Sequence, residues 1–274
     1  MTINCKGELI DFKTPKVMGI LNVTPDSFFD GGRFKDEKNA LKQVEKMLLE
    51  GAGFIDIGAY SSKPGATEVS GALELSRITP IVELILKHFP EVLLSIDTFR
   101  GTVARECVER GAAIVNDISA GLRDETLLDT VASLQVPYIM MHMRGTPKTM
   151  QQQTVYQHLI QDILLFFSQR LNVARGKGIT DVIIDPGFGF AKSLEQNYQL
   201  LQQLETLKVA DLPILAGISR KSMIYKLLKS DPKNALNGTT ALHMVALTKG
   251  ANILRVHDVK EAVECVKLYK QLTS

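Results

Sequence analysis

The feature that most constrains this fold is a series of eight short apolar runs, nearly all of which end on or enclose a polar residue. Continuous apolar runs of this length are typical of parallel strands that are buried on both faces. Amphipathic segments separate most of the runs, as expected for helices that connect parallel strands. The runs are Val17–Leu21, Phe54–Ile57, Val92–Ile96, Ala113–Val115, Tyr138–Met141, Val182–Ile184, Ile214–Ile218 and Ile253-Leu254.

Eight strands that alternate with helices over about 250 residues predict an α/β fold, a single-domain (β/α)8 TIM barrel. We assign the barrel to residues 17–274. Residues 1–16 precede it as an N-terminal extension, for which we expect a short hairpin that closes the bottom of the barrel. The hydrophobic periodicity predicts helices near 37–50 and 259–272, and a capping box predicts another that begins at Ser193.

Composition narrows the class of protein. The chain has 274 residues, of which 45% are hydrophobic, so it can bury a large core. A net charge of +2 argues against a broad nucleic-acid footprint. Three scattered cysteines without ligand spacing indicate free thiols in a reducing compartment. The N-terminus lacks the apolar core of a signal peptide, and no apolar stretch approaches about 18 residues. We expect a soluble, cytoplasmic protein.

The polar residues at the strand ends are candidates for the active site, because the chemistry of such barrels sits at the carboxyl ends of the strands. Asp97, Asn116, Asp185 and Lys221 follow the third, fourth, sixth and seventh runs. Two carboxylates, an amide and an ammonium suit a flat heterocycle with donors and acceptors along its edge. One such acid alone is equally well explained as a structural ion pair. Four together favour a binding site, since unpaired buried charge is costly.

A second group of strand-end residues suits an anion. Arg255 and His257 leave the last run on the same side, by the period of two in a strand, and strands seven and eight commonly form the phosphate site of this barrel class. Asn22 ends the first run and suits Mg²⁺ that also holds substrate phosphates, although an asparagine there can equally pin a turn. His142 can either touch a ligand or support its neighbours, and Asp56 receives no role.

Seven segments then resemble, in order, the motifs of one family, the dihydropteroate synthases of the pterin-binding barrel group. The resemblance spans Val17 to Val259, and the combination of motifs is highly specific. The segments are GILNVTPDSFFDGG (Gly19–Gly32), DIGAYSSKPGA (Asp56–Ala66), SIDTFR (Ser95–Arg100), NDISA (Asn116–Ala120), DPGFGFAK (Asp185–Lys192), GISRKS (Gly217–Ser222) and RVHDV (Arg255–Val259).

The resemblance implies a reaction and a set of site residues. The family condenses (7,8-dihydropterin-6-yl)methyl diphosphate with 4-aminobenzoate, giving 7,8-dihydropteroate and diphosphate in folate biosynthesis; sulfonamides compete with 4-aminobenzoate. It also implies Mg²⁺ as cofactor and a homodimer formed through helices remote from the rim. By resemblance, the pterin is held by Asp97, Asn116, Asp185 and Lys221, the diphosphate and Mg²⁺ by Asn22, Arg255 and His257, and the aminobenzoate by Ser62, Lys63, Pro64, Phe190 and Ser222. The residues expected to act in catalysis are Asp97, Lys221, Arg255 and His257.

The chain departs from the family pattern in its first two loops. Ser62-Lys63 stands where Thr-Arg is usual, so the hydroxyl and the charge are kept but the bidentate fork of arginine is lost. Ala59-Tyr60 replaces a common Gly-Glu pair, and Phe29 a common serine. These departures bear on aminobenzoate affinity and sulfonamide sensitivity, not on the reaction itself.

Two alternative functions share the pterin-binding barrel. A pterin-dependent methyltransferase would keep the ring contacts but would need neither the Asn22 loop nor the pair Arg255 and His257. A catalytically silent pterin-binding paralogue should have lost rim residues, whereas here every key position except Lys63 is filled as in the family. The sequence therefore favours the synthase.

Overall fold

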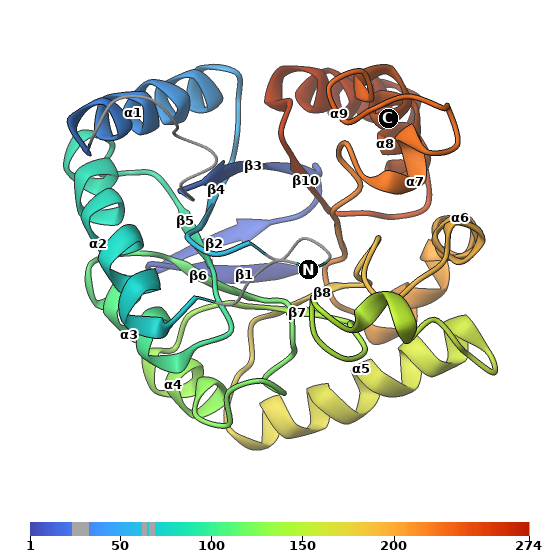
Figure 1. Cartoon of the computed structure of the whole chain (residues 1–274), viewed down its shortest axis with the longest axis horizontal. Helices are drawn as coiled ribbons and strands as arrows, with labels where there is room; N and C mark the ends of the chain where they lie inside the picture. Colours follow the sequence, from blue (N-terminus) through green and yellow to red (C-terminus); the bar gives the residue numbers. More distant parts are fainter. Residues whose placement is uncertain (24–32, 62–64, 66–68, 274) are drawn as a thin grey trace.

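The computed structural model describes residues 1–23, 33–61, 65 and 69–273, except the side chains of 33–36. Within these residues, eight parallel strands form a barrel that helices surround (Figure 1). Each predicted apolar run overlaps one strand of the barrel, so the predicted TIM barrel is confirmed. The strands are β3 (Lys16–Asn22), β4 (Phe54–Gly58), β5 (Leu94–Asp97), β6 (Ile114–Asp117), β7 (Tyr138–Met141), β8 (Val182–Asp185), β9 (Leu215–Ala216) and β10 (Ile253–Val256).

The strand order explains how the ends of distant segments meet. The strands run β8-β7-β6-β5-β4-β3-β10-β9 around the barrel, and every pair is parallel. A parallel bridge between Ile184 and Ile214, with a 2.9 Å hydrogen bond from the Ile184 amide to the Pro213 carbonyl, brings β8 beside the approach to β9. All carboxyl ends therefore lie on one rim.

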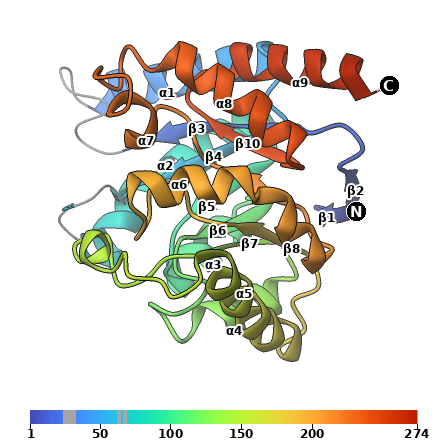
Figure 2. The same cartoon turned by 90° about the vertical axis from the view of Figure 1, so that its right-hand side faces the viewer.

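The helices cover the outside of this barrel (Figures 1 and 2). The helix predicted near 37–50 begins four residues earlier, and the one predicted near 259–272 agrees to within one residue. Ser193 caps α6 as predicted, in a full capping box with Gln196. The helices are α1 (Arg33–Leu49), α2 (Gly71–His88), α3 (Gly101–Glu109), α4 (Leu127–Leu134), α5 (Leu159–Gly176), α6 (Leu194–Gln202), α7 (Ser222–Tyr225), α8 (Leu236–Thr248) and α9 (Val259–Thr273), with short 3-10 helices η2 (Met150–Gln152) and η3 (Leu204–Ala210).

The N-terminal segment forms a hairpin of β1 (Thr2–Cys5) and β2 (Glu8–Asp11), paired antiparallel. Figure 2 places it at one end of the barrel. Ile3, Cys5 and Phe12 are buried in the apolar cluster that the inward-facing side chains at the amino ends of the strands form. The hairpin therefore covers the amino ends of the strands, and the polar strand-end residues lie at the opposite end of the barrel.

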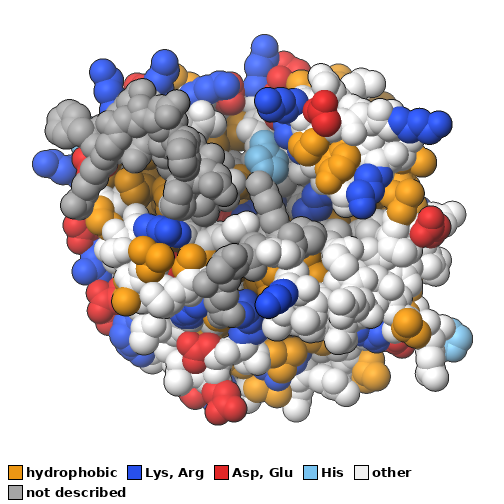
Figure 3. Space-filling model, viewed as in Figure 1, with side chains coloured by type: hydrophobic (Ala, Val, Ile, Leu, Met, Phe, Trp, Pro, Cys, Tyr) orange, Lys and Arg blue, Asp and Glu red, His pale blue; other side chains and the backbone are white. Residues whose placement is uncertain are grey.

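The apolar core has a layered arrangement. Outward-facing strand residues and the inner faces of the helices form the main cluster, and a smaller cluster that includes Tyr60, Phe99 and Met141 lies at the carboxyl ends. On the face seen in Figure 3, acidic and basic side chains are scattered around the outer edge of the molecule. Among the described residues, no helix is both long and apolar enough to cross a membrane.

Candidate active site

The mouth of the barrel holds a buried cluster of charged residues centred on Arg255. Its Nε donates to Asp56 Oδ2 at 2.6 Å, and its Nη2 donates to Asp97 Oδ2 at 2.9 Å. Asn116 donates from Nδ2 to the same Asp56 oxygen at 3.0 Å. The parallel register sets Asp97 beside Asn116 and the neighbouring Gly58. Residues from β4, β5, β6 and β10 thus converge on one point, as the shared rim requires.

Burial determines the electrostatics of this cluster. Asp56 is completely buried, and Asp97 and Asn116 are nearly so. Burial raises the pKa of the Asp97 carboxyl, against the opposing effect of the Arg255 guanidinium, because the charged form loses hydration. Burial alone would lower the pKa of Arg255, but the adjacent carboxylates of Asp56 and Asp97 outweigh this effect and raise the pKa above its already high value. A cation shared by two buried acids is expected to be strongly held.

Asp185 and Lys221 form the second half of the mouth. Asp185 Oδ1 accepts a 2.7 Å hydrogen bond from the Gly187 amide, and Lys221 Nζ donates to the Phe188 carbonyl. A Cβ atom at Gly217 would lie 3.7 Å from Lys221 Nζ and 3.9 Å from Asp185 Oδ2, so both charged groups approach this glycine. Burial lowers the pKa of Lys221 to about 8, although Asp185 favours its charged form.

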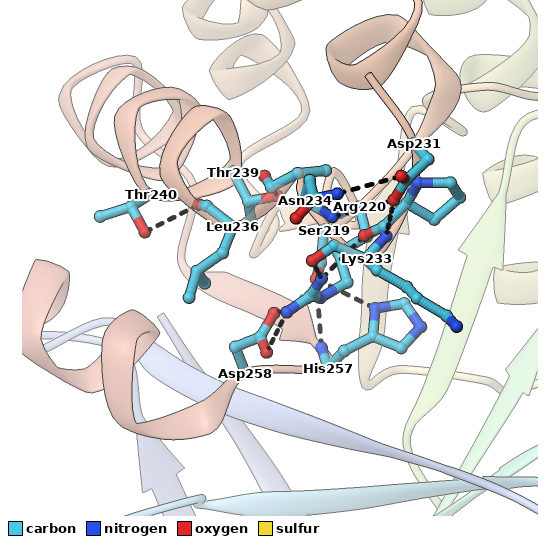
Figure 4. A network of polar contacts seen from close by, with 12 residues as sticks. Ser219, Arg220, Asp231, Lys233, Asn234, Leu236, Thr239, Thr240, His257 and Asp258 are labelled. Carbon is cyan, nitrogen blue, oxygen red and sulfur yellow. Dashed lines mark hydrogen bonds and ion pairs between the residues drawn. The ribbon is translucent and has the colours of Figure 1, made fainter.

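The segment after β9 fixes the direction of Lys221. Arg220 lies in the left-handed backbone region with φ of 53°, and its guanidinium donates to both carboxylate oxygens of Asp258 at 2.8 Å. Ser219 Oγ lies 3.0 Å from His257 Nδ1 and accepts from the His257 amide at 3.2 Å (Figure 4). These contacts tie the loop after β9 to the end of β10. They turn Arg220 outward, so Lys221 can face the mouth.

The predicted aminobenzoate residues are only partly within the described chain. Phe190 lies in the loop after β8, with the Lys221 ammonium 4.7 Å from the centre of its ring. Ser222 is the first residue of the short helix α7, directly after Lys221. Both therefore lie beside the Asp185 and Lys221 pair. Ser62, Lys63 and Pro64, together with Phe29, lie outside the described residues.

Asn22 ends β3 with an exposed side chain, in register with Gly58 of β4. Within the described residues, no group of three His, Cys, Asp or Glu side chains could hold a metal. Mg²⁺ does not need one, because it keeps several waters and often takes only one or two protein oxygens plus substrate phosphates. The exposed amide oxygen of Asn22 fits a metal that arrives with a diphosphate.

Comparison with known proteins assigns this barrel to a family. The model of the pterin-binding enzyme family matches residues 18–257. The dihydropteroate synthase of Haemophilus influenzae is 43% identical over 272 residues, 98% of each chain.

Solved structures agree. That of the Yersinia pestis dihydropteroate synthase with a sulfonamide drug superposes with a TM-score of 0.94 at 42% identity, covering 100% of this chain and 99% of the other. The Xanthomonas albilineans enzyme in complex with 7,8-dihydropteroate has a TM-score of 0.89 at 35% identity, with the same coverage. This chain belongs to the dihydropteroate synthase family of pterin-binding enzymes. The resemblance predicted from the motifs is confirmed.

The sequence left the roles of His142 and Asp56 open, and the structure gives each of them partners. This histidine is buried and accepts a 3.1 Å hydrogen bond from Lys192 Nζ, which also donates to the carbonyls of Gly187 and Phe190 at 3.0 Å. Burial and the nearby Lys192 hold the pKa of His142 well below its usual value, so its ring is neutral. His142 therefore helps Lys192 shape the loop that carries Phe190. Lys192, at the end of the DPGFGFAK motif, is the feature of the sequence from which this contact could have been inferred.

Asp56 is the other residue whose role the sequence left open. It lies inside an apolar run, so its burial was expected, but its partner Arg255 is almost 200 residues away in the chain. The structure makes Asp56 the common acceptor for Arg255 and Asn116. The position of a charged residue inside an apolar run could have indicated a cationic partner, because a fully buried carboxylate needs a cation nearby.

Proposed function

We propose that this chain condenses (7,8-dihydropterin-6-yl)methyl diphosphate with 4-aminobenzoate to form 7,8-dihydropteroate and diphosphate. It is a dihydropteroate synthase by family, an enzyme that transfers an alkyl group other than methyl. The observation that carries the assignment to this mouth is the convergence of Asp97, Asn116, Asp185 and Lys221 around one buried region. The relative in complex with 7,8-dihydropteroate supports the choice of product.

The pterin ring would lie among these four residues. Asp185 still has Oδ2 available for charge-assisted hydrogen bonds from the amidine-like edge of the ring. Lys221 can donate to the ring carbonyl, and Asn116 can offer both an acceptor and a donor. Asp97, which is hydrogen-bonded to Arg255, would place negative charge near the exocyclic methylene group.

The diphosphate would lie beside Asn22, Arg255 and His257. The Arg255 guanidinium is held by Asp56 and Asp97, so it can add positive charge at the rim without moving. His257 is exposed at the rim beside Arg255, and an imidazole ring can donate a hydrogen bond to a phosphate oxygen. Mg²⁺, held by Asn22 and the substrate phosphates, would neutralise charge on the leaving group.

The aminobenzoate would lie at the outer side of the mouth, against Phe190 and Ser222. Ser62, Lys63 and Pro64 of the second loop are the other proposed contacts. The Yersinia pestis relative was solved in complex with a sulfonamide drug, which supports a site for such compounds in this chain. Lys63 would attract the carboxylate as a point charge, without the two-pronged contact of an arginine.

The reaction would proceed by departure of the diphosphate before the amine attacks. The bond between the methylene carbon and the bridging oxygen breaks, and its electron pair leaves with the diphosphate. The dihydropterin ring donates electrons to the methylene carbon, and the Asp97 carboxylate stabilises the positive charge. The neutral arylamine then forms the carbon–nitrogen bond and loses a proton. Exclusion of water from the mouth would prevent hydrolysis of the cation.

We also propose that the protein works in the cytoplasm as a homodimer. The three free cysteines are buried, as suits a reducing compartment. Exposed apolar side chains on α8 and α9, among them Val245, Leu268 and Leu272, offer a surface remote from the mouth. Sedimentation of the purified chain would test the dimer.

Product formation tests the proposed function against its alternatives. The protein is incubated with both substrates and Mg²⁺, and 7,8-dihydropteroate is detected by mass. A silent paralogue would bind the pterin and form no product, and a methyltransferase would instead transfer the methyl group of a methylated folate. Either result would reject the synthase. Asp185→Asn serves as the matched variant, because it keeps the shape of the side chain and removes the charge that the pterin edge needs.

A further inference from the structure

The tyrosine at position 60 contacts the site through a bond that the usual glutamate of the family could not make. Tyr60 OH donates to Asp97 Oδ1 at 3.1 Å, and the side chain is buried. A phenol can donate one proton, whereas an ionised glutamate has none to donate. The residue stands two positions after β4, next to the loop that we assign to aminobenzoate. Any role of this bond in substrate recognition rests on the proposed function.

The ring of Tyr60 is held by packing against Phe99, on which further side chains pack. It packs edge-on against Phe99, with 5.4 Å between ring centroids and an interplanar angle of 89°. Phe99 in turn lies against two guanidinium groups, whose carbon atoms are 4.3 Å (Arg100) and 3.7 Å (Arg123) from its centroid. Arg100 also donates to the Val69 carbonyl at 2.6 Å and is paired with the buried Glu74. The hydroxyl is therefore held in place by a chain of packed side chains.

The two carboxylate oxygens of Asp97 each accept a hydrogen bond from a different residue. Tyr60 OH holds Oδ1 at 3.1 Å, and Arg255 Nη2 holds Oδ2 at 2.9 Å. Each carboxylate oxygen keeps a further acceptor site for a substrate donor. We propose that Tyr60 is a positioning residue for pterin recognition in this chain, since its hydroxyl sets the plane of the Asp97 carboxylate that faces the dihydropterin.

The charges around Asp97 give this contact a second effect. Asp56 and Glu74 raise the pKa of the Asp97 carboxyl, whereas Arg255 and the hydrogen bond from Tyr60 lower it. Lys221 also faces the group from the loop after β9. Burial and the nearby acids hold the pKa of Tyr60 well above its usual value, so the phenol stays neutral. A glutamate at this position would add a like charge and favour protonated Asp97.

The test compares the wild type with Tyr60→Phe, which keeps the packing on Phe99 and removes only the hydroxyl. We expect the KM for the dihydropterin diphosphate to rise roughly tenfold, as for a hydrogen bond to a charged group, and the KM for 4-aminobenzoate to change less than about twofold. The acidic limb of kcat/KM should move to higher pH by roughly 0.5 to 1 unit, since the hydroxyl favours the ionised carboxylate. Tyr60→Glu should move that limb further in the same direction.

Tyr198→Phe is the matched control, because its hydroxyl donates to the Met223 carbonyl at 2.9 Å, away from Asp97. It should leave the pterin KM and the acidic limb unchanged. A Tyr60→Phe protein with a wild-type pterin KM and pH profile would overturn the proposal. So would an equal rise of both KM values, which would indicate general loosening of the mouth.

Direct calorimetric binding of 6-hydroxymethylpterin separates this inference from the proposed function. If the wild type formed no dihydropteroate, the proposed function would fail. The comparison of pterin affinity between wild type and Tyr60→Phe would still decide the role of Tyr60. A loss of about tenfold in affinity would support that role, and equal affinities would reject it.

Discussion

Arg255 is the residue whose removal tests the electrostatic account of the mouth most severely. Its guanidinium is the hydrogen-bonded cation for Asp56 and Asp97, and the Asp56 carboxylate is completely buried. Arg255→Met keeps an unbranched apolar stem at this position and removes the guanidinium with its charge. Two neighbouring carboxylates are then left in a buried site, which costs about 3–5 kcal/mol of folding free energy. For a domain somewhat smaller than this one, each kcal/mol lowers Tm by about 2–4 °C, so we expect a drop of roughly 10 °C.

The assay is thermal unfolding at neutral pH, with two further variants. Arg110→Met is the control, because Arg110 also bridges two acids, Glu83 at 2.8 Å and Glu106 at 2.6 Å, but on the surface. Such exposed pairs contribute less than about 1 kcal/mol each. Adding Asp56→Asn to Arg255→Met should recover at least half of the lost stability, because one of the two uncompensated charges is removed.

Catalysis separates the structural part of this role from the functional part. The double variant should regain stability without regaining turnover, since the charge that we assign to the diphosphate remains absent. An Arg255→Met protein that melts within about 2 °C of the wild type would refute the reasoning on burial. Full turnover in that variant would refute the diphosphate assignment.

The geometry of the same rim supports three further predictions. The pH profile of kcat/KM should be a narrow bell. Its acidic limb should lie above the usual carboxyl range, because Asp97 must be ionised and burial raises its pKa. Its basic limb should lie near pH 8, because Lys221 must be protonated and burial lowers its pKa to about 8. Gly187→Ala should lower the free energy of unfolding by at least about 2 kcal/mol, because φ is 71° and the new Cβ would overlap the His142 carbonyl oxygen. Gly178→Ala is the control, since its φ is 89° but its Cβ would meet open space, and it should lower that free energy by only about 1 kcal/mol. Urea unfolding measures both variants. Chelation of Mg²⁺ should abolish turnover of the pterin diphosphate, and calorimetry should show unchanged affinity for 6-hydroxymethylpterin, which carries no phosphate.

The barrel was predictable because its signal is local. Each parallel strand is buried on both faces and is therefore a continuous apolar run, and each run ends where the chain reaches the polar rim. Runs such as Val182–Ile184 indicated strand positions to within one or two residues. The start of α1 was predicted less accurately, since this helix begins at Arg33, where no apolar stripe marks the first turn.

The partners of the rim residues were not predictable, because they depend on contacts across the barrel. Arg255 was expected to lie beside His257, but its guanidinium is held by Asp56 and Asp97. Tyr60 was recognised only as a departure from the family pattern, and its bond to Asp97 depends on the packing of Phe99. Strand-end position predicts which residues face the mouth, not which of them pair.

The central claim is that this mouth joins a dihydropterin to an arylamine with loss of diphosphate. The most direct measurement monitors diphosphate and 7,8-dihydropteroate in the same reaction, with and without 4-aminobenzoate. We predict that both products appear in equal amounts with the wild type when 4-aminobenzoate and Mg²⁺ are present, and that Asp185→Asn forms neither at a comparable rate. Diphosphate release that ignores 4-aminobenzoate, with no dihydropteroate formed, would contradict the account.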